Sequence, residues 1–141
     1  MDNTELKQRT KDFALRVIRV CGVLPRGMVA DVLGRQLVRS ATSVAANYRS
    51  ACRAKSRSDF ISKMGTVEEE ADETMLWLEW IADASLLPGS RLAPLTEEAN
   101  ALTAIAVKSI RTARAHYSSL VADARRPQSA TPNNGCRSSK S

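Results

Sequence analysis

The chain has 141 residues, a formal net charge of +6 and a sequence pI of about 9.7. This length suits one domain, and a composition rich in Ala, Leu, Val, Arg, Glu and Lys, with few Gly and Pro, predicts an all-α fold. The chain has no secretory signal pattern, no apolar run of membrane-spanning length and only three widely spaced cysteines, so we expect a cytoplasmic protein without a disulfide framework.

The first two predicted helices are separated by a Pro-Gly break at residues 24–27. The first helix runs from about Thr4, a candidate N-cap, to about Val23. Its apolar face holds Leu6, Phe13, Val17, Val20, Cys21 and Leu24. The second helix begins near Met28, and its apolar residues recur every three or four positions, as one helix face requires. They are Leu33, Leu37, Ala41, Val44, Tyr48 and Cys52.

Two further amphipathic helices follow. Ser56 and Asp59 fit a capping box that starts the third helix, which ends at residues 87–90. Its apolar residues are Phe60, Met64, Val67, Ala71, Met75, Leu78 and Ala82. The fourth helix begins at residues 91–94, with Pro94 in its first turn, and extends to about residue 124. Its apolar residues are Leu95, Ala99, Leu102, Ala106, Ile110, Ala113, Tyr117 and Leu120.

Short loops between four amphipathic helices favour one architecture, an antiparallel up-down-up-down four-helix bundle. We expect this bundle to occupy residues 1–124. Residues 125–141 are rich in Pro, Ser, Asn and Arg and lack an apolar stripe, so we predict a disordered basic tail.

Cations gather on the outward faces of three predicted helices. A rotation of about 100° per residue places them away from the apolar stripes. They are Arg35, Arg39, Arg49 and Arg53 on the second helix, Arg16 and Arg19 on the first, and Lys108, Arg111 and Arg114 on the fourth. Because 15 of the 21 cations are arginines, whose guanidinium groups suit phosphate, we interpret these residues as candidate nucleic-acid contacts. An ordinary solvated surface is the alternative.

The third helix is acidic instead, and it carries both tryptophans. Its outward acids are Glu69, Asp72, Glu73, Glu79 and Asp83. Trp80 points about 180° from the centre of the apolar stripe, and Trp77 lies at the margin of the stripe. Exposed tryptophan beside charge is typical of protein interfaces, so we predict a homo-oligomer interface at Trp77, Trp80, Glu69 and Glu73.

No residue pattern predicts catalysis. The single histidine, His116, has no acid near it in the sequence, and the Glu-x-x-His pairs of di-iron bundles are absent. No phosphate-loop or dinucleotide motif occurs either. We therefore expect no catalytic residue, no metal and no cofactor, although a metal-dependent enzyme built on the acids of the third helix stays open as a weaker hypothesis.

Three sequence blocks resemble a known bacterial family. They are residues 36–49 (QLVRSATSVAANYR), 58–65 (SDFISKMG) and 70–79 (EADETMLWLE). In this order they resemble the four-helix bundle proteins encoded in intervening sequences of 23S rRNA genes, a family that includes the accessory variability protein of diversity-generating retroelements. The resemblance covers roughly residues 10–120.

The resemblance implies a ring-like homopentamer without catalysis, whose basic surface contacts nucleic acid; the retroelement members partner a reverse transcriptase. The family motif maps onto Gln36, Arg39, Ser43, Asn47, Arg49, Glu70, Asp72, Glu73, Trp77 and Glu79. For Ser43 and Asn47 we expect hydrogen bonding between helices. The sequence departs from the family at Ala46, Ser50 and Glu69, where members commonly have Gly, Glu and Lys.

Together these observations predict a non-enzymatic homo-oligomer that binds nucleic acid, in particular RNA, through arginine-rich faces. The alternative is a protein-interaction scaffold, or an accessory subunit of an enzyme such as a reverse transcriptase, that does not bind nucleic acid directly.

Overall fold

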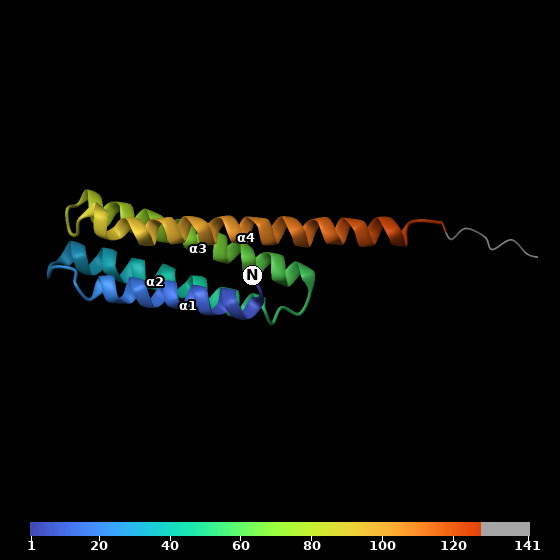
Figure 1. Ribbon diagram of the computed structural model, residues 1–141, viewed down its shortest axis with the longest axis horizontal. Coiled ribbons are helices and arrows are strands. Elements are labelled where there is room, and N and C mark those ends of the chain that lie inside the picture. Colours follow the sequence, from blue (N-terminus) through green and yellow to red (C-terminus); the bar gives the residue numbers. More distant parts are fainter. Residues whose placement is uncertain (128–141) are drawn as a thin grey trace, which may run out of the picture.

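A computed structural model describes residues 1–127 of the chain. It contains the helices α1 (Asn3–Cys21), α2 (Met28–Ala51), α3 (Arg57–Asp83) and α4 (Gly89–Ala124). Each helix packs against the next along the chain, and α4 closes the bundle against α1 (Figure 1). The predicted all-α antiparallel bundle is thus confirmed. Of the predicted tail, residues 128–141 lie outside the described residues.

Capping side chains determine where the helices begin. Asp2, rather than Thr4, caps α1: its carboxylate accepts a hydrogen bond from the backbone N–H of Glu5 at 2.8 Å, and the Glu5 carboxylate accepts one from the Asp2 N–H at 3.1 Å. Gly27 precedes α2 with φ 148°, a value that favours glycine. Ser56 caps α3 by accepting from the Asp59 N–H at 3.0 Å, as the sequence predicts.

The carboxylate of Asp59 completes the cap differently from a capping box. It accepts a hydrogen bond from the backbone N–H of Lys55, at 3.1 Å, rather than from that of Ser56. It also pairs with the Lys63 ammonium at 3.1 Å. At the start of α4, Pro94 lies in the second turn instead of the first, because the helix begins at Gly89.

The predicted apolar stripes form one shared core. Phe13, Val17, Leu37, Met64 and Leu78 are at most 1% exposed. Small side chains at positions such as 41, 71, 99 and 106 are equally buried, which lets the helices approach closely. Truncating one of the large core residues to Ala would cost about 2–5 kcal/mol of unfolding free energy. The fold is therefore held mainly by this apolar core.

The C-terminal part of α4 extends past the core. Ile110 is the last buried residue of the helix, although α4 continues to Ala124, a further length of about 21 Å at 1.5 Å per residue. Figure 1 shows this segment projecting beyond the other helices. Tyr117 and Leu120, which we expected on the core stripe, are 59% and 50% exposed because they lie beyond Ile110, the last buried residue of α4. That part of the predicted stripe is wrong.

No helix in the described range combines the length and the apolar character needed to span a membrane.

Candidate nucleic-acid interface

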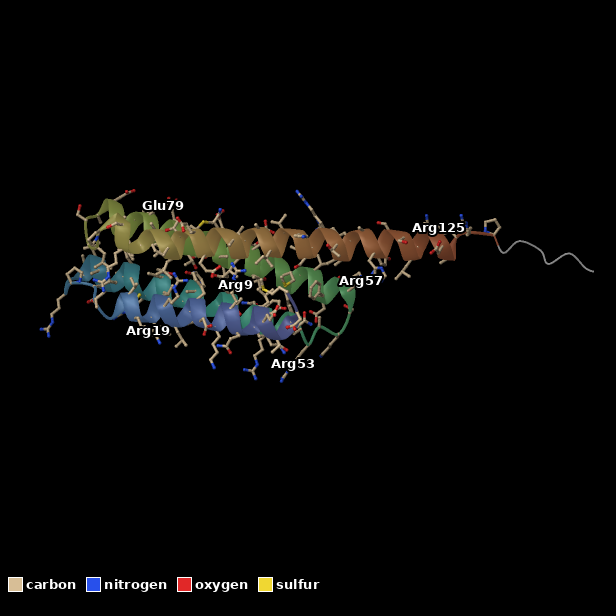
Figure 2. The ribbon with its side chains drawn as sticks, viewed as in Figure 1. Arg9, Arg19, Arg53, Arg57, Glu79 and Arg125 are labelled. Carbon is tan, nitrogen blue, oxygen red and sulfur yellow. The ribbon has the colours of Figure 1, made fainter. Side chains whose placement is uncertain are left out.

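Most candidate nucleic-acid contacts of α1, α2 and the loop after α2 are solvent-exposed. The exposed side chains are Arg19, Arg35, Arg49 and Arg53, while Arg16 is half-buried. None of them forms an ion pair within residues 1–127. Arg19 and Arg53 point away from α4, on the opposite side of the molecule from Glu79 (Figure 2). Arg53 follows the end of α2 instead of lying on the helix, which corrects the prediction for that residue.

Arg39 differs from the other arginines because it is paired within the chain. Its guanidinium donates to both oxygens of Glu70, at 3.3 and 3.2 Å, and to Glu73. The hydrogen bond to Glu73, and then the nearby charges of Glu70 and Glu73, raise the pKa of Arg39 above its ordinary value. Gln36 accepts from Nε of Arg39 at 3.0 Å, and Trp77 donates to Glu73 at 3.1 Å. These residues form one network that joins α2 to α3.

Five residues of the family motif thus meet in this network. Two carboxylates largely neutralise the Arg39 charge, so this arginine contributes less to a cationic surface than Arg35, one turn earlier on α2. The sequence places both residues on the outer side of the helix, but it does not reveal that α3 supplies acids to only one of them.

The polar residues inside the bundle are also arranged differently from our expectation. Asn47 donates to the hydroxyl of Ser43 at 2.8 Å and to its carbonyl at 2.9 Å, so this pair bonds within α2 and not between helices. The hydrogen bond between helices comes instead from Thr74, whose hydroxyl donates to that of Ser40 at 2.9 Å. Both of these residues are fully buried.

The candidate contacts on α4 lie on a helix segment without acids. No Asp or Glu occurs between Glu98 and Asp123. Lys108, Arg111 and Arg114 are all exposed in this interval. The segment of α4 between Glu98 and Asp123 therefore carries a net positive charge.

Arg114 is the least favourable of these cations for phosphate. It lines a groove of about 540 Å³ between α3 and α4, together with Glu68, Glu69 and Asp72. A phosphate in that groove would meet the three carboxylates as well as the guanidinium. Lys108 and Arg111 do not line this groove.

Two of the predicted oligomer-interface residues are exposed, and the other two are hydrogen-bonded to each other. Trp80 is 48% exposed, and Glu69 is exposed as well. Trp77 and Glu73 are half-buried and hydrogen-bonded to each other. The two indole rings pack edge to face, with centroids 5.3 Å apart and an interplanar angle of 77°. Trp80 therefore rests on Trp77 and presents its outer surface to solvent, as its sequence position predicts.

Sequence reasoning missed exposed apolar residues on α2, near the level of Trp80. Val29 and Val32 are each 53% exposed, and Leu76 on α3 is 39% exposed. The pairing of Arg39 with Glu70 and Glu73 fixes the antiparallel register, which puts Val32 at the same level as Trp80. The spacing of Val29 and Val32 was a usable signal, because neither lies on the core stripe of α2.

Two observations concern reactive groups in the described residues. Burial raises the pKa of the Cys21 thiol to about 11, so the thiol stays protonated at neutral pH. Within residues 1–127, no three His, Cys, Asp or Glu side chains come together as a group that could hold a metal ion.

Comparisons with known proteins identify relatives of this bundle. The family described as "23S rRNA-intervening sequence protein" matches residues 2–108. A crystal structure of a protein of unknown function from the S23 ribosomal protein family of Bacteroides thetaiotaomicron superposes with a TM-score of 0.69 at 29% identity, covering 74% of this chain and 96% of that chain. Comparison with curated proteins gave no match. The projecting part of α4 lies beyond the family match.

Proposed function

Since this chain belongs to the 23S rRNA-intervening sequence protein family, we propose that it is a non-enzymatic homo-oligomer that binds RNA through cationic faces on α1, α2 and α4. The observation that carries the proposal is the set of exposed cations without ion-pair partners in the described residues: Arg19, Arg35, Arg49, Arg53, Lys108, Arg111 and Arg114.

The mode of binding follows from the side chains at the surface. Arginine and lysine neutralise backbone phosphates and release bound counterions, which gives strong but sequence-independent affinity. Phe13 and Tyr48 are buried in the core, and Trp80 and Tyr117 are the well-exposed aromatic residues of the described chain. With few rings available to stack on bases, binding should follow charge and shape. RNA is the favoured polymer because the description of the family refers to 23S rRNA.

Self-association is supported by the apolar surface where α2 and α3 meet. Leu76 and Trp80 on α3 and Val29 and Val32 on α2 are each at least 39% exposed, and the register of the two helices puts Val32 at the level of Trp80. A patch of this composition, centred on an indole, is what a subunit interface buries. Assembly would also place the cationic faces of several subunits on one particle, which strengthens binding to a long polyanion.

The test is a titration of fluorescently labelled RNA, followed by anisotropy at several salt concentrations. We expect wild-type binding to weaken steeply with salt. Replacing Arg35, Arg49 and Arg111 with Gln should lower the slope of log K against log salt by about 2, because each lost phosphate contact on a single strand removes about 0.7.

A control of equal charge uses Lys7, Lys11 and Arg91, which are exposed but lie outside the proposed contacts. Their replacement with Gln should change the slope much less. If both triple variants lose the same amount, only net charge matters and the assigned faces are wrong. If wild-type protein assembles but binds no RNA even at low salt, the chain is a protein-interaction scaffold instead.

A further inference from the structure

The point where α4 leaves the bundle forms a second cationic feature, separate from the outward faces of α1 and α2. A groove of about 670 Å³ opens there between the start of α3 and one face of α4. Its polar side chains are Arg57, Lys108, Ser109, Thr112 and His116, and we call it the junction groove. No acid lines it. Figure 2 shows Arg57 at the beginning of α3, below α4.

Arg57 carries the main evidence for a ligand. Its Nη1 atom is buried and has no hydrogen-bond partner in the described residues. A buried guanidinium N–H without an acceptor costs folding free energy, so native structures seldom retain one without a use for it. The nearest acid along α3, Asp59, is already engaged with Lys55 and Lys63. Within residues 1–127, the chain itself supplies no acceptor for this atom.

The hydroxyls of the groove give independent support. On α4, Thr96, Thr103 and Ser118 each donate to the backbone carbonyl four residues earlier. Within the described part of the chain, Ser109 and Thr112 make no such hydrogen bond. Their hydroxyls are therefore free to donate to a ligand in the groove.

The geometry of α4 places these donors in a row. Lys108, Thr112 and His116 follow one another at intervals of four residues, which puts them on one helix face about 6 Å apart along the axis. Hydroxyl donors beside an arginine and a lysine match the hydrogen-bonding needs of a phosphate group, whose oxygens accept from several donors at once.

We propose that the junction groove binds a phosphate group of the RNA backbone, held by Arg57, Lys108, Ser109 and Thr112. This proposal rests on the proposed RNA binding and adds a defined anchor to the cationic faces. Ser109, Thr112 and His116 lie beyond the family match, which ends at residue 108, whereas Arg57 and Lys108 lie within it.

The experiment has two arms on the full chain. In the first, inorganic phosphate is titrated into labelled protein and followed by NMR. We expect saturable shifts of the Ser109, Thr112 and His116 resonances, which Arg57→Gln abolishes. In the second, RNA binding is measured against salt. Arg57→Gln should reduce the salt slope by about 0.7, while Arg91→Gln, an exposed arginine near the start of α4, leaves it unchanged.

The outcomes separate this anchor from the general function. RNA binding that Arg57→Gln leaves intact, with no saturable phosphate shift, overturns the anchor but not the proposed function. Saturable phosphate binding without RNA binding would leave a phosphate site in the groove, but it would overturn both the assignment of that phosphate to RNA and the proposed function. Phosphate shifts spread evenly over all cationic faces overturn the groove. Should Arg57→Gln fold poorly, Thr112→Val tests the same contact without a charge change, and it should weaken phosphate binding.

Discussion

Arg35 and Arg39 offer a matched pair for separating RNA contacts from structural ion pairs. Both are exposed and lie one turn apart on α2, but only Arg39 is held by Glu70 and Glu73. Replacing Arg35 with Gln should therefore weaken RNA binding with little effect on stability. Replacing Arg39 with Gln should do the reverse.

The magnitudes follow from the contacts. The Arg39 side chain is 47% exposed, so solvent screening limits its two ion pairs to a combined gain of about 1 kcal/mol. Its loss should lower the melting temperature by about 4 °C. Losing a phosphate contact at Arg35 should reduce the slope of log K against log salt by about 0.7. When the salt concentration rises fourfold, the RNA affinity of this variant should therefore fall by a factor about 2.6 times smaller than that of wild type.

Urea and thermal unfolding followed by circular dichroism measure the first effect, and RNA anisotropy at several salt concentrations measures the second. Equal changes in both variants, in either assay, would refute the reasoning. A loss of RNA binding confined to Arg39→Gln would show that the charge paired with α3 still reaches the polymer, and that the arginines on α2 are assigned the wrong roles.

Three other predictions concern assembly and stability. Trp80→Ala should raise the dissociation constant for self-association about 30-fold, equivalent to about 2 kcal/mol. Tyr117→Ala, which removes an exposed aromatic side chain outside the proposed interface, should leave that constant unchanged. Sedimentation across a concentration series measures both constants. Thr74→Val should lower the unfolding free energy by about 1 kcal/mol, because the hydrogen bond to Ser40 is lost. The double variant Thr74→Val/Ser40→Ala should lose less unfolding free energy than the sum of the two single variants, as urea unfolding would show. The Lys55 N–H, followed by the Lys63 ammonium, lowers the pKa of Asp59 below its ordinary 3.8, so its stabilisation is present above pH 3.8 and is lost as the pH falls through the lower folded-state value. Asp59→Asn should accordingly have a lower free energy of unfolding than wild type at neutral pH, and the difference should disappear at acidic pH. A difference that remains at acidic pH would contradict the assignment.

The sequence was sufficient for the architecture because helical periodicity is a local property. The stripes of α1, α2 and α3, and that of α4 as far as Ile110, all enter the core. Periodicity does not reveal where neighbouring helices end, however. Tyr117 and Leu120 continue the α4 stripe at the correct spacing but lie beyond the last buried residue of the helix, so they remain exposed.

The candidate site was less predictable, because its chemistry depends on pairing between helices. Arg35 and Arg39 look equivalent in the sequence, and only the register of α2 against α3 distinguishes them. Arg57 was overlooked for a similar reason. Its significance comes from a buried nitrogen without a partner, next to a face of α4 more than fifty residues away in the chain.

The central claim is that several copies of this chain assemble and bind RNA together. Light scattering coupled to size-exclusion chromatography, with and without RNA, tests both parts in one measurement. We predict a protein mass several times that of the 15.4 kDa chain, and a larger mass at low salt once RNA is added. A single-chain mass that RNA leaves unchanged would contradict the account.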